Sequence, residues 1–330
     1  MSEPATKTMN MIEAINSALD VMLAKDPEVV IMGEDVGYFG GVFRATAGLQ
    51  KKHGKTRVFD TPISECGIIG VGVGMAAYGL RPVPEIQFAD YIWPGLNQLF
   101  TEVSRSNYLS NGKWPVSCVI RVPIGAYGSG GPYHSSSVES VLANIRGIKV
   151  VYPSNPYDAK GLLKSAIRDD DPVIFMESEV MYGDKGEVPD GEYTIPIGVA
   201  DIKREGTDVT IVSFGKIIKE AYIAADELAK EGISCEIIDL RTVRPMDNET
   251  ILTSVKKTNR LVILEEAWPF ASVSSEIAYI VQERAFDFLD APIQRITTAD
   301  TPAPYSPVLL KEWLPNAADV IKAVKKVMNK

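Results

Sequence analysis

Short apolar runs alternate with amphipathic segments along most of the chain, and this alternation constrains the fold more than any other feature. In the first half, apolar runs typical of buried strands cover residues 29–32, 85–88, 116–122, 149–152 and 173–176. Segments with apolar residues at helical spacing lie between them, at 10–25, 67–79, 94–108 and 155–168. Such alternation favours an α/β fold, a mostly parallel sheet flanked by helices. We therefore expect one such domain over residues 1–190.

The alternation pauses over residues 181–208 and then resumes. Glycine, proline and charged residues without periodicity fill the first part of this interval, so we expect a connecting segment there. Further on, predicted strands cover 209–214, 235–240, 261–264 and 293–297, and predicted helices cover 217–231, 248–257, 272–286 and 316–328. The sequence therefore predicts a second, smaller α/β domain over residues 200–330.

Composition excludes several classes of function. The net charge of −9 argues against a nucleic-acid surface, and no apolar run approaches the roughly 20 residues of a membrane span. The first eight residues lack the apolar core of a secretion signal. Cys66, Cys118 and Cys235 are too widely spaced for a disulfide framework or a metal site, and we expect them to be small core residues. These features favour a cytoplasmic protein.

A loop over residues 125–137 contains four glycines, one proline and His134, one of two histidines in the chain. It follows the predicted strand 116–122, and open α/β sheets bind ligands beyond the carboxyl ends of their strands. The imidazole group can accept or donate a proton near neutral pH. Position alone leaves open whether His134 is a site residue or an exposed loop residue.

The stretch 60–67 reads Asp-Thr-Pro-Ile-Ser-Glu-Cys-Gly and precedes a predicted helix. Ser64 is a suitable N-cap, which places Glu65 in the first turn, where the helix dipole stabilises a carboxylate. From position alone, Glu65 is either an ordinary first-turn glutamate or a site residue.

Other polar residues also follow predicted strands. They are Glu34 and Asp35 after one strand, Gln87 with Tyr91 after another, and His134. Polar groups from several strand ends can converge on one crevice, and we expect a ligand site there.

Gly72-x-Gly74-x-x-Ala77 matches the dinucleotide-binding pattern, which leaves a nicotinamide-dependent oxidoreductase as an alternative. That pattern belongs in the turn after a strand, whereas these glycines lie inside the predicted helix 67–79. Each glycine inside a helix costs about 0.5–1 kcal/mol relative to alanine. We therefore expect this helix to pack closely on another backbone or on a second subunit.

At these residues the chain resembles a known family, the β subunits of the decarboxylase component of 2-oxo acid dehydrogenase complexes. The resemblance runs from about residue 9 to the C-terminus. It rests on residues 33–36, 40–44, 60–65, 85–88, 133–135, 158–163, 239–242 and 244–247. It implies a thiamin-diphosphate pyrimidine-binding domain followed by a transketolase C-terminal-like domain.

The resemblance also implies a cofactor, thiamin diphosphate, and roles for individual residues. Glu65 would hydrogen-bond the aminopyrimidine ring nitrogen and act as the proton switch. The other residues that would line the cofactor are Glu34, Ile63, Gln87 and Tyr91. His134 would be the active-site histidine, transferring protons to the substrate or to the incoming lipoyl group. Many relatives continue His-Ser-Gln, whereas Ser136 stands at the third position here.

By the same resemblance, a structural potassium ion would be held by Cys118, Ala166, Ile167, Asp169 and Asp171. From the residues alone, the three aspartates 169–171 before Pro172 suit a solvated turn equally well.

The usual diphosphate motif of thiamin enzymes, Gly-Asp-Gly, does not occur in the sequence. We therefore expect this chain to hold only the pyrimidine half of the site, with an α subunit supplying the diphosphate half and most of the Mg²⁺ ligands. The resemblance implies an α₂β₂ heterotetramer that binds the lipoyl acyltransferase core of the complex.

The resemblance leaves the substrate open between pyruvate, which we favour slightly, and branched-chain 2-oxo acids. A stand-alone transketolase-type enzyme would need a diphosphate motif and a further domain. A non-catalytic assembly subunit is another alternative. Glu265 and Glu266 follow a predicted strand, and we expect them to be solvated charges.

Overall fold

The computed structural model describes residues 6–126 and 130–330, which form two compact units. The first unit comprises residues up to 125 and residues 141–197, and the second comprises residues 126–140 and 198–330. Each unit is an α/β structure with a mostly parallel sheet, as the alternation predicts. Within the described ranges no helix has the length and apolar character needed to cross a bilayer.

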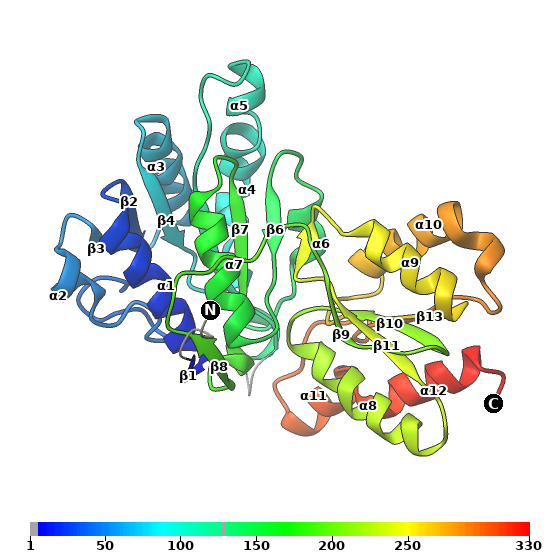
Figure 1. The fold of residues 1–330 in the computed structure, drawn as a ribbon. Coiled ribbons are helices and arrows are strands. Elements are labelled where there is room, and N and C mark those ends of the chain that lie inside the picture. Colours follow the sequence, from blue (N-terminus) through cyan, green and yellow to red (C-terminus); the bar gives the residue numbers. More distant parts are fainter. Residues whose placement is uncertain (1–5, 127–129) are drawn as a thin grey trace. The chain divides into compact units, whose positions relative to one another are not determined.

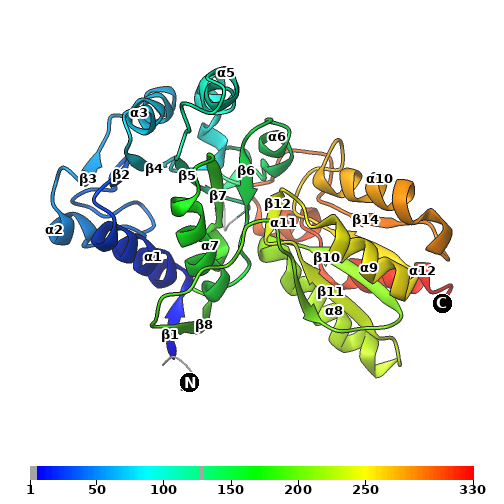
Figure 2. The same cartoon turned by 45° about the horizontal axis from the view of Figure 1, so that its top comes forward.

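The sheet of the first unit is parallel (Figure 2). Its strands, in spatial order, are β6 (Lys149–Val151), β7 (Val173–Ser178), β5 (Val119–Ile124), β4 (Arg81–Glu85), β2 (Val29–Gly33) and β3 (Val58–Asp60). Every residue of β2, β5 and β7 is buried, as expected for a parallel sheet covered on both faces.

Helices α1 (Met11–Lys25) and α7 (Pro156–Arg168) lie together on one face of this sheet, and α3 (Glu65–Ala77) lies on the other (Figure 2). Asn10 caps α1 in a capping box with Glu13, and Asn155 caps α7 by accepting a hydrogen bond from the amide of Asp158. The periodic apolar residues of α1 and α7 fill the main core of the unit.

The single helix expected over 94–108 is wrong. The structure has short helical pieces instead, α4 (Leu96–Gln98), a wider turn over Leu99–Val103 and α5 (Ser106–Leu109). The hydroxyls of Thr101, Ser104 and Ser106 each donate to the carbonyl oxygen four residues earlier. Such bonds compete with the regular backbone ladder and interrupt a helix. The remaining short helix of the unit is α2 (Leu49–His53).

The strand expected over 85–88 is also misplaced, because β4 ends at Glu85. Pro82 and Pro84 lie inside β4, where a proline removes a backbone donor and hides the usual strand pattern. β4 pairs with β2 along its whole length but meets β5 only through Glu85 and Arg121.

The connecting segment 181–208 contains strands that the sequence did not reveal. β8 (Lys185–Pro189) pairs antiparallel with β1 (Thr6–Asn10), and β9 (Asp201–Arg204) pairs antiparallel with β11 (Cys235–Asp239). Most residues of β8 and β9 are at least partly exposed, so these strands lack the apolar pattern of buried strands.

The second unit has the strand order β14 (Gln294–Ile296), β13 (Leu261–Leu264), β10 (Val209–Ser213), β11 and β9. Figure 1 shows α8 (Ile218–Lys230) and α12 (Ala317–Val327) together on one face, with α9 (Asn248–Thr258) and α10 (Val273–Ala285) on the other. The remaining elements are α6 (Glu139–Ala143), β12 (Thr242–Arg244) and α11 (Pro307–Trp313), which the sequence did not predict.

Candidate cofactor and proton-transfer site

Three neighbouring strands of the first unit end at the same edge of the sheet. Gly33, the last residue of β2, is in register with Asp60 at the end of β3 and with Glu85 at the end of β4. The residues that follow these strands therefore start side by side. This edge is the place where a parallel α/β sheet offers a ligand site.

Glu65 opens α3 at this edge. Ser64 caps the helix, since its Oγ accepts from the amide of Gly67 at 3.3 Å, while its carbonyl accepts from Ile68 at 2.7 Å. The predicted cap is confirmed, and the Glu65 carboxyl lies half-buried in the first turn, where free amides and the helix dipole favour negative charge.

Glu34 and Glu65 lie near each other at this edge. Burial raises the pKa of Glu34 above its usual value, and the charges of Glu65, Asp35 and Glu85 add to the shift. A carboxyl with a raised pKa holds its proton more readily near neutral pH and can donate a hydrogen bond. The structure therefore brings together two of the residues that the resemblance assigns to the cofactor.

The other predicted cofactor residues lie in the same unit. Gln87 is half-buried beyond the end of β4, and Tyr91 packs edge-to-face on Phe88 with ring centroids 6.2 Å apart. Ile63, in the segment between β3 and α3, is 82% exposed. A largely exposed isoleucine in this segment is available to contact an apolar ligand surface.

One polar atom near these residues lacks a partner. The Oγ1 of Thr61 is buried and has no hydrogen-bond partner among the described residues. Buried hydroxyls are rarely left unpaired, so this atom is consistent with a group that the chain alone does not supply. Thr61, like Glu34 and Ile63, lies just beyond the end of a strand at this edge, so its free hydroxyl is available to a ligand bound there.

A buried ion-pair network supports this edge, and the sequence analysis missed it. Arg121 Nη1 donates to Glu85 Oε2 at 2.5 Å, and its Nε and Nη2 donate to Glu177 at 2.6 and 2.8 Å. Tyr182 also donates to Glu177, at 2.9 Å. Since Glu85 contributes to the raised pKa of Glu34, the network influences the candidate site electrostatically. The only sequence signal was an arginine inside an apolar strand.

His134 belongs to the second unit, and not to the first domain as the expected boundaries implied. It follows a short turn at Gly131–Tyr133, and the ring of Tyr305 lies directly over Gly131. Residues 127–129 of the predicted loop lie outside the described residues. Because Glu65 and His134 lie in different units, their convergence on one crevice stays a prediction.

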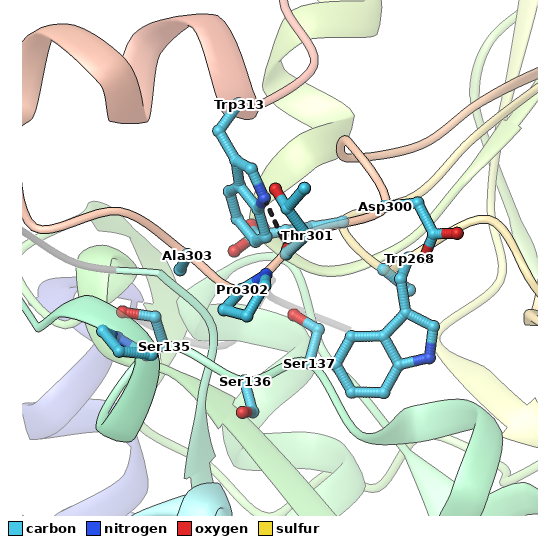
Figure 3. Close-up of a pocket in the computed structure, with 12 residues that line it drawn as sticks. Ser135, Ser136, Ser137, Trp268, Asp300, Thr301, Pro302, Ala303 and Trp313 are labelled. Carbon is cyan, nitrogen blue, oxygen red and sulfur yellow. Dashed lines mark hydrogen bonds between the residues drawn. The ribbon is translucent and has the colours of Figure 1, made fainter.

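A pocket of about 450 Å³ lies within the second unit, beside residues 132–137, which we call the His134 segment. Figure 3 shows Ser135, Ser136 and Ser137 along one side, with Trp268 and Trp313 on others. The indole of Trp313 donates to the carbonyl of Thr301 at 2.9 Å, which fixes one wall. The pocket makes this segment accessible to a small molecule.

The expectation that Glu265 and Glu266 are solvated charges is wrong. Their exposed fractions are 0% and 4%. Glu265 accepts from the amide of Ser274 at 3.1 Å, and Glu266 accepts from the amide of Ala126 at 2.7 Å. For Glu266 the sequence could not reveal this, because its partner Ala126 lies 140 residues away in the chain.

The residues of the predicted potassium site lie around the C-terminal end of α7, where other groups already contact their oxygens. Arg81 Nη1 donates to the carbonyls of Ile167 and Asp169 at 3.1 and 3.0 Å. Lys149 pairs with Asp169 and Asp171 at 2.7 and 3.1 Å. The aspartates are therefore ion-paired, and potassium binding there stays a prediction. No cluster of metal-ligating side chains occurs in residues 6–126 and 130–330.

The dinucleotide pattern does not have the required context, because Gly72, Gly74 and Ala77 all lie inside α3. A Cβ added at Gly72 would meet Pro84 and Cys118 at 3.4–3.5 Å, so this glycine packs on the sheet. At Gly74 an added Cβ would meet no described atom within 4 Å. A Cβ at Gly72 would make only ordinary van der Waals contacts, so packing within the chain does not require glycine there, and Gly74 lies on an open face.

Comparisons with known proteins agree with this arrangement. Residues 7–185 match the model of the transketolase pyrimidine-binding domain, and residues 198–320 match the transketolase C-terminal domain. The chain is 46% identical to the β subunit of 2-oxoisovalerate dehydrogenase from Bacillus subtilis, over 97% of this chain and 98% of that protein.

The β subunit of the pyruvate dehydrogenase E1 component from the same organism is equally similar, with 46% identity and the same coverage. A solved structure described as a split-gene transketolase, an inactive β4 tetramer, has the same fold, with a TM-score of 0.77 and 21% identity over 97% of this chain and 98% of that one. The chain therefore belongs to the family of β subunits of 2-oxo acid dehydrogenase complexes, built from a transketolase pyrimidine-binding domain and a transketolase C-terminal domain.

Proposed function

We propose that this chain is the β subunit of a thiamin-diphosphate-dependent 2-oxo acid dehydrogenase, which decarboxylates pyruvate and transfers the acyl group to a lipoyl domain. The observation that carries the proposal is the pair Glu34 and Glu65 at one strand edge, in a chain that belongs to this family. Branched-chain 2-oxo acids are the alternative substrates, since both kinds of relative are 46% identical.

Glu65 has the central role in this proposal. Its carboxyl would hold a proton shared with the pyrimidine ring nitrogen, in the first turn of α3, where the Ser64 cap fixes its position. When bound, the coenzyme supplies the electron sink for decarboxylation. Glu34, with its raised pKa, would donate a hydrogen bond, while Ile63, Gln87 and Tyr91 would line the ring.

His134 would transfer protons to the substrate or to the lipoyl group. Histidine suits this task because imidazole can be protonated or neutral near physiological pH. The pocket beside Ser135–Ser137 supports this role, because it leaves room for a small molecule next to the histidine segment.

The chain would work only with an α subunit. The sequence lacks the Gly-Asp-Gly motif, so the diphosphate and most of the Mg²⁺ ligands would come from α. We propose an α₂β₂ heterotetramer, with the open face of α3 around Gly74 as one contact, and binding to a lipoyl acyltransferase core. Domain limits near 1–190 and 200–330, joined by 181–208, are part of this proposal, with residues 126–140 grouped in the second unit.

The test is reconstitution of the chain with the α subunit of the same organism, thiamin diphosphate and Mg²⁺. Rates with pyruvate and with 3-methyl-2-oxobutanoate would be measured with an artificial electron acceptor and with a lipoyl domain. We expect no decarboxylation by either chain alone and a higher kcat/KM with pyruvate. Preference for the branched-chain acid would select the alternative substrate, and no turnover of any 2-oxo acid would remove the proposal.

A further inference from the structure

Both backbone groups of Ala126 are held by one buried ion pair in the second unit. The amide of Ala126 donates to Glu266 Oε1 at 2.7 Å, and its carbonyl accepts from Lys216 Nζ at 2.6 Å. Lys216 Nζ and Glu266 Oε2 are themselves 2.8 Å apart. The three groups form a closed ring, and the two charged side chains are only 10% and 4% exposed.

The sheet places this pair. Lys216 follows β10 and Glu266 follows β13, which are neighbouring parallel strands in register from Thr210 and Leu261. Their carboxyl ends therefore lie at one edge of the sheet, and the two side chains meet there. Ala126, the first residue of the second unit, is bound at this edge.

The charge of Glu266 also acts on Glu139, which follows His134 in the sequence. Glu139, the first residue of α6, is 1% exposed, and its Oε2 has no hydrogen-bond partner among the described residues. Burial raises the pKa of Glu139 well above its usual value, and the nearby charges of Glu265 and Glu266 add to this shift. In the sequence, His134 thus lies between Ala126, which hydrogen-bonds Glu266, and Glu139, whose pKa the charge of Glu266 helps to raise.

Stability alone does not account for this pair. A buried ion pair usually contributes no more to stability than well-packed apolar residues of similar size. What apolar side chains cannot do is hydrogen-bond both the amide and the carbonyl of one residue. Glu266 hydrogen-bonds the amide of Ala126, and Lys216 hydrogen-bonds its carbonyl.

We propose that Glu266 and Lys216 are positioning residues for His134. They hold the start of the segment that carries the imidazole, so that the histidine keeps one place relative to the second unit. The proposal rests on the proposed function of His134, but the anchoring itself can be tested without any activity.

The direct test uses the chain's two histidines, His53 and His134, as probes. The full chain is labelled with ¹³C at histidine Cε1, and His53→Gln assigns the two signals. The anchor is removed by Lys216→Met with Glu266→Met, an apolar pair that should still fold. We expect the His134 signal to shift or broaden while the His53 signal is unchanged.

A matched control is Glu236→Gln. Glu236 is also fully buried in the second unit and paired with a lysine, Lys257, but it bonds the amide of Gly206. This control should leave both histidine signals in place. A His134 signal that is identical in the wild type and in the folded double-methionine variant would overturn the proposal.

A kinetic arm connects the anchor to catalysis in the enzyme reconstituted with α. Lys216→Met with Glu266→Met should lower kcat at least about tenfold, with thiamin diphosphate affinity within twofold of wild type, because misplacement of a reacting group affects mainly the chemical step. In a His134→Ala background the same pair of substitutions should have no further effect. Equal losses in both backgrounds would show that the anchor acts independently of His134.

The two arms separate this inference from the proposed function. If the wild-type complex turns over no 2-oxo acid, the proposed function fails, and the histidine signals still decide whether the anchor exists. If the complex is active and the signals do not respond, the proposed function stands and the anchoring role is wrong.

Discussion

Glu34 and Glu65 approach each other from different elements, one after β2 and the other at the start of α3, and the charge of Glu65 contributes to the raised pKa of Glu34. Burial of Glu34 and the neighbouring negative charge both raise its pKa, so the protonated form of Glu34 is favoured. That arrangement suits a ring that needs both a hydrogen-bond donor and an acceptor.

Replacing Glu65 tests the proton switch. Glu65→Gln keeps the size and the helix position but cannot exchange a proton, so turnover of the reconstituted enzyme should fall by at least about 100-fold. The measurement is the steady-state rate together with circular dichroism of the variant. Glu276→Gln, another first-turn glutamate in α10, is the control and should keep wild-type activity. Normal turnover in Glu65→Gln would remove the assigned role.

Replacing Arg121 tests the network beneath the strand edge. Arg121→Met leaves Glu85 and Glu177 buried without their cation, which should cost about 3–5 kcal/mol in the free energy of unfolding. Denaturant titration of the full chain measures this. Arg284→Met breaks an exposed pair with Glu249 and should change stability by less than about 1 kcal/mol. Equal losses in the free energy of unfolding for the two variants would show that the buried network contributes no more to stability than an exposed ion pair.

A substitution at Gly131 tests whether the contact with Tyr305 fixes the position of the His134 segment. Its φ is +60°, and an added Cβ would lie 2.2 Å from the ring of Tyr305. Gly131→Ala should therefore displace the segment and lower turnover by on the order of 10- to 100-fold. Gly232→Ala, at φ +76° with no described atom within 4 Å, carries the backbone strain alone and should leave turnover unchanged. Similar rates for both variants would mean that the Tyr305 contact has no catalytic importance.

The raised pKa of Glu139 predicts a pH dependence of stability. Above its usual value, 4.5, the folded chain binds more protons at this group than the unfolded chain does, so stability falls as the pH rises through this window. Glu139→Gln removes the ionisation and should flatten that decline. Thermal unfolding between pH 4.5 and 8.5 measures the difference, which should grow with pH in favour of the variant. A difference that is constant with pH would show that Glu139 is not buried as described.

The sequence predicted the features that depend on local patterns. The helices over α1 and α7 and the buried parallel strands followed from the periodicity of apolar residues. The Ser64 cap followed from helix-capping preferences and placed Glu65 correctly in the first turn.

The sequence could not predict the features that depend on distant partners. Pro82 and Pro84 hid β4, and β8 was invisible because its partner β1 lies at the other end of the first unit's sequence. Glu266 looked like a solvated charge because Ala126, the group that it bonds, lies 140 residues away. The sequence also placed His134 in the first domain, because the second-unit residues that contact residues 126–140 lie far away in the chain.

The most direct test of the whole account is the binding of thiamin diphosphate with Mg²⁺, measured by calorimetric titration into this chain, into the α subunit and into the two together. The account predicts saturable binding only to the mixture, because this chain has a carboxyl pair for the pyrimidine ring and lacks the Gly-Asp-Gly motif for the diphosphate. Tight binding and decarboxylation by this chain alone would contradict it.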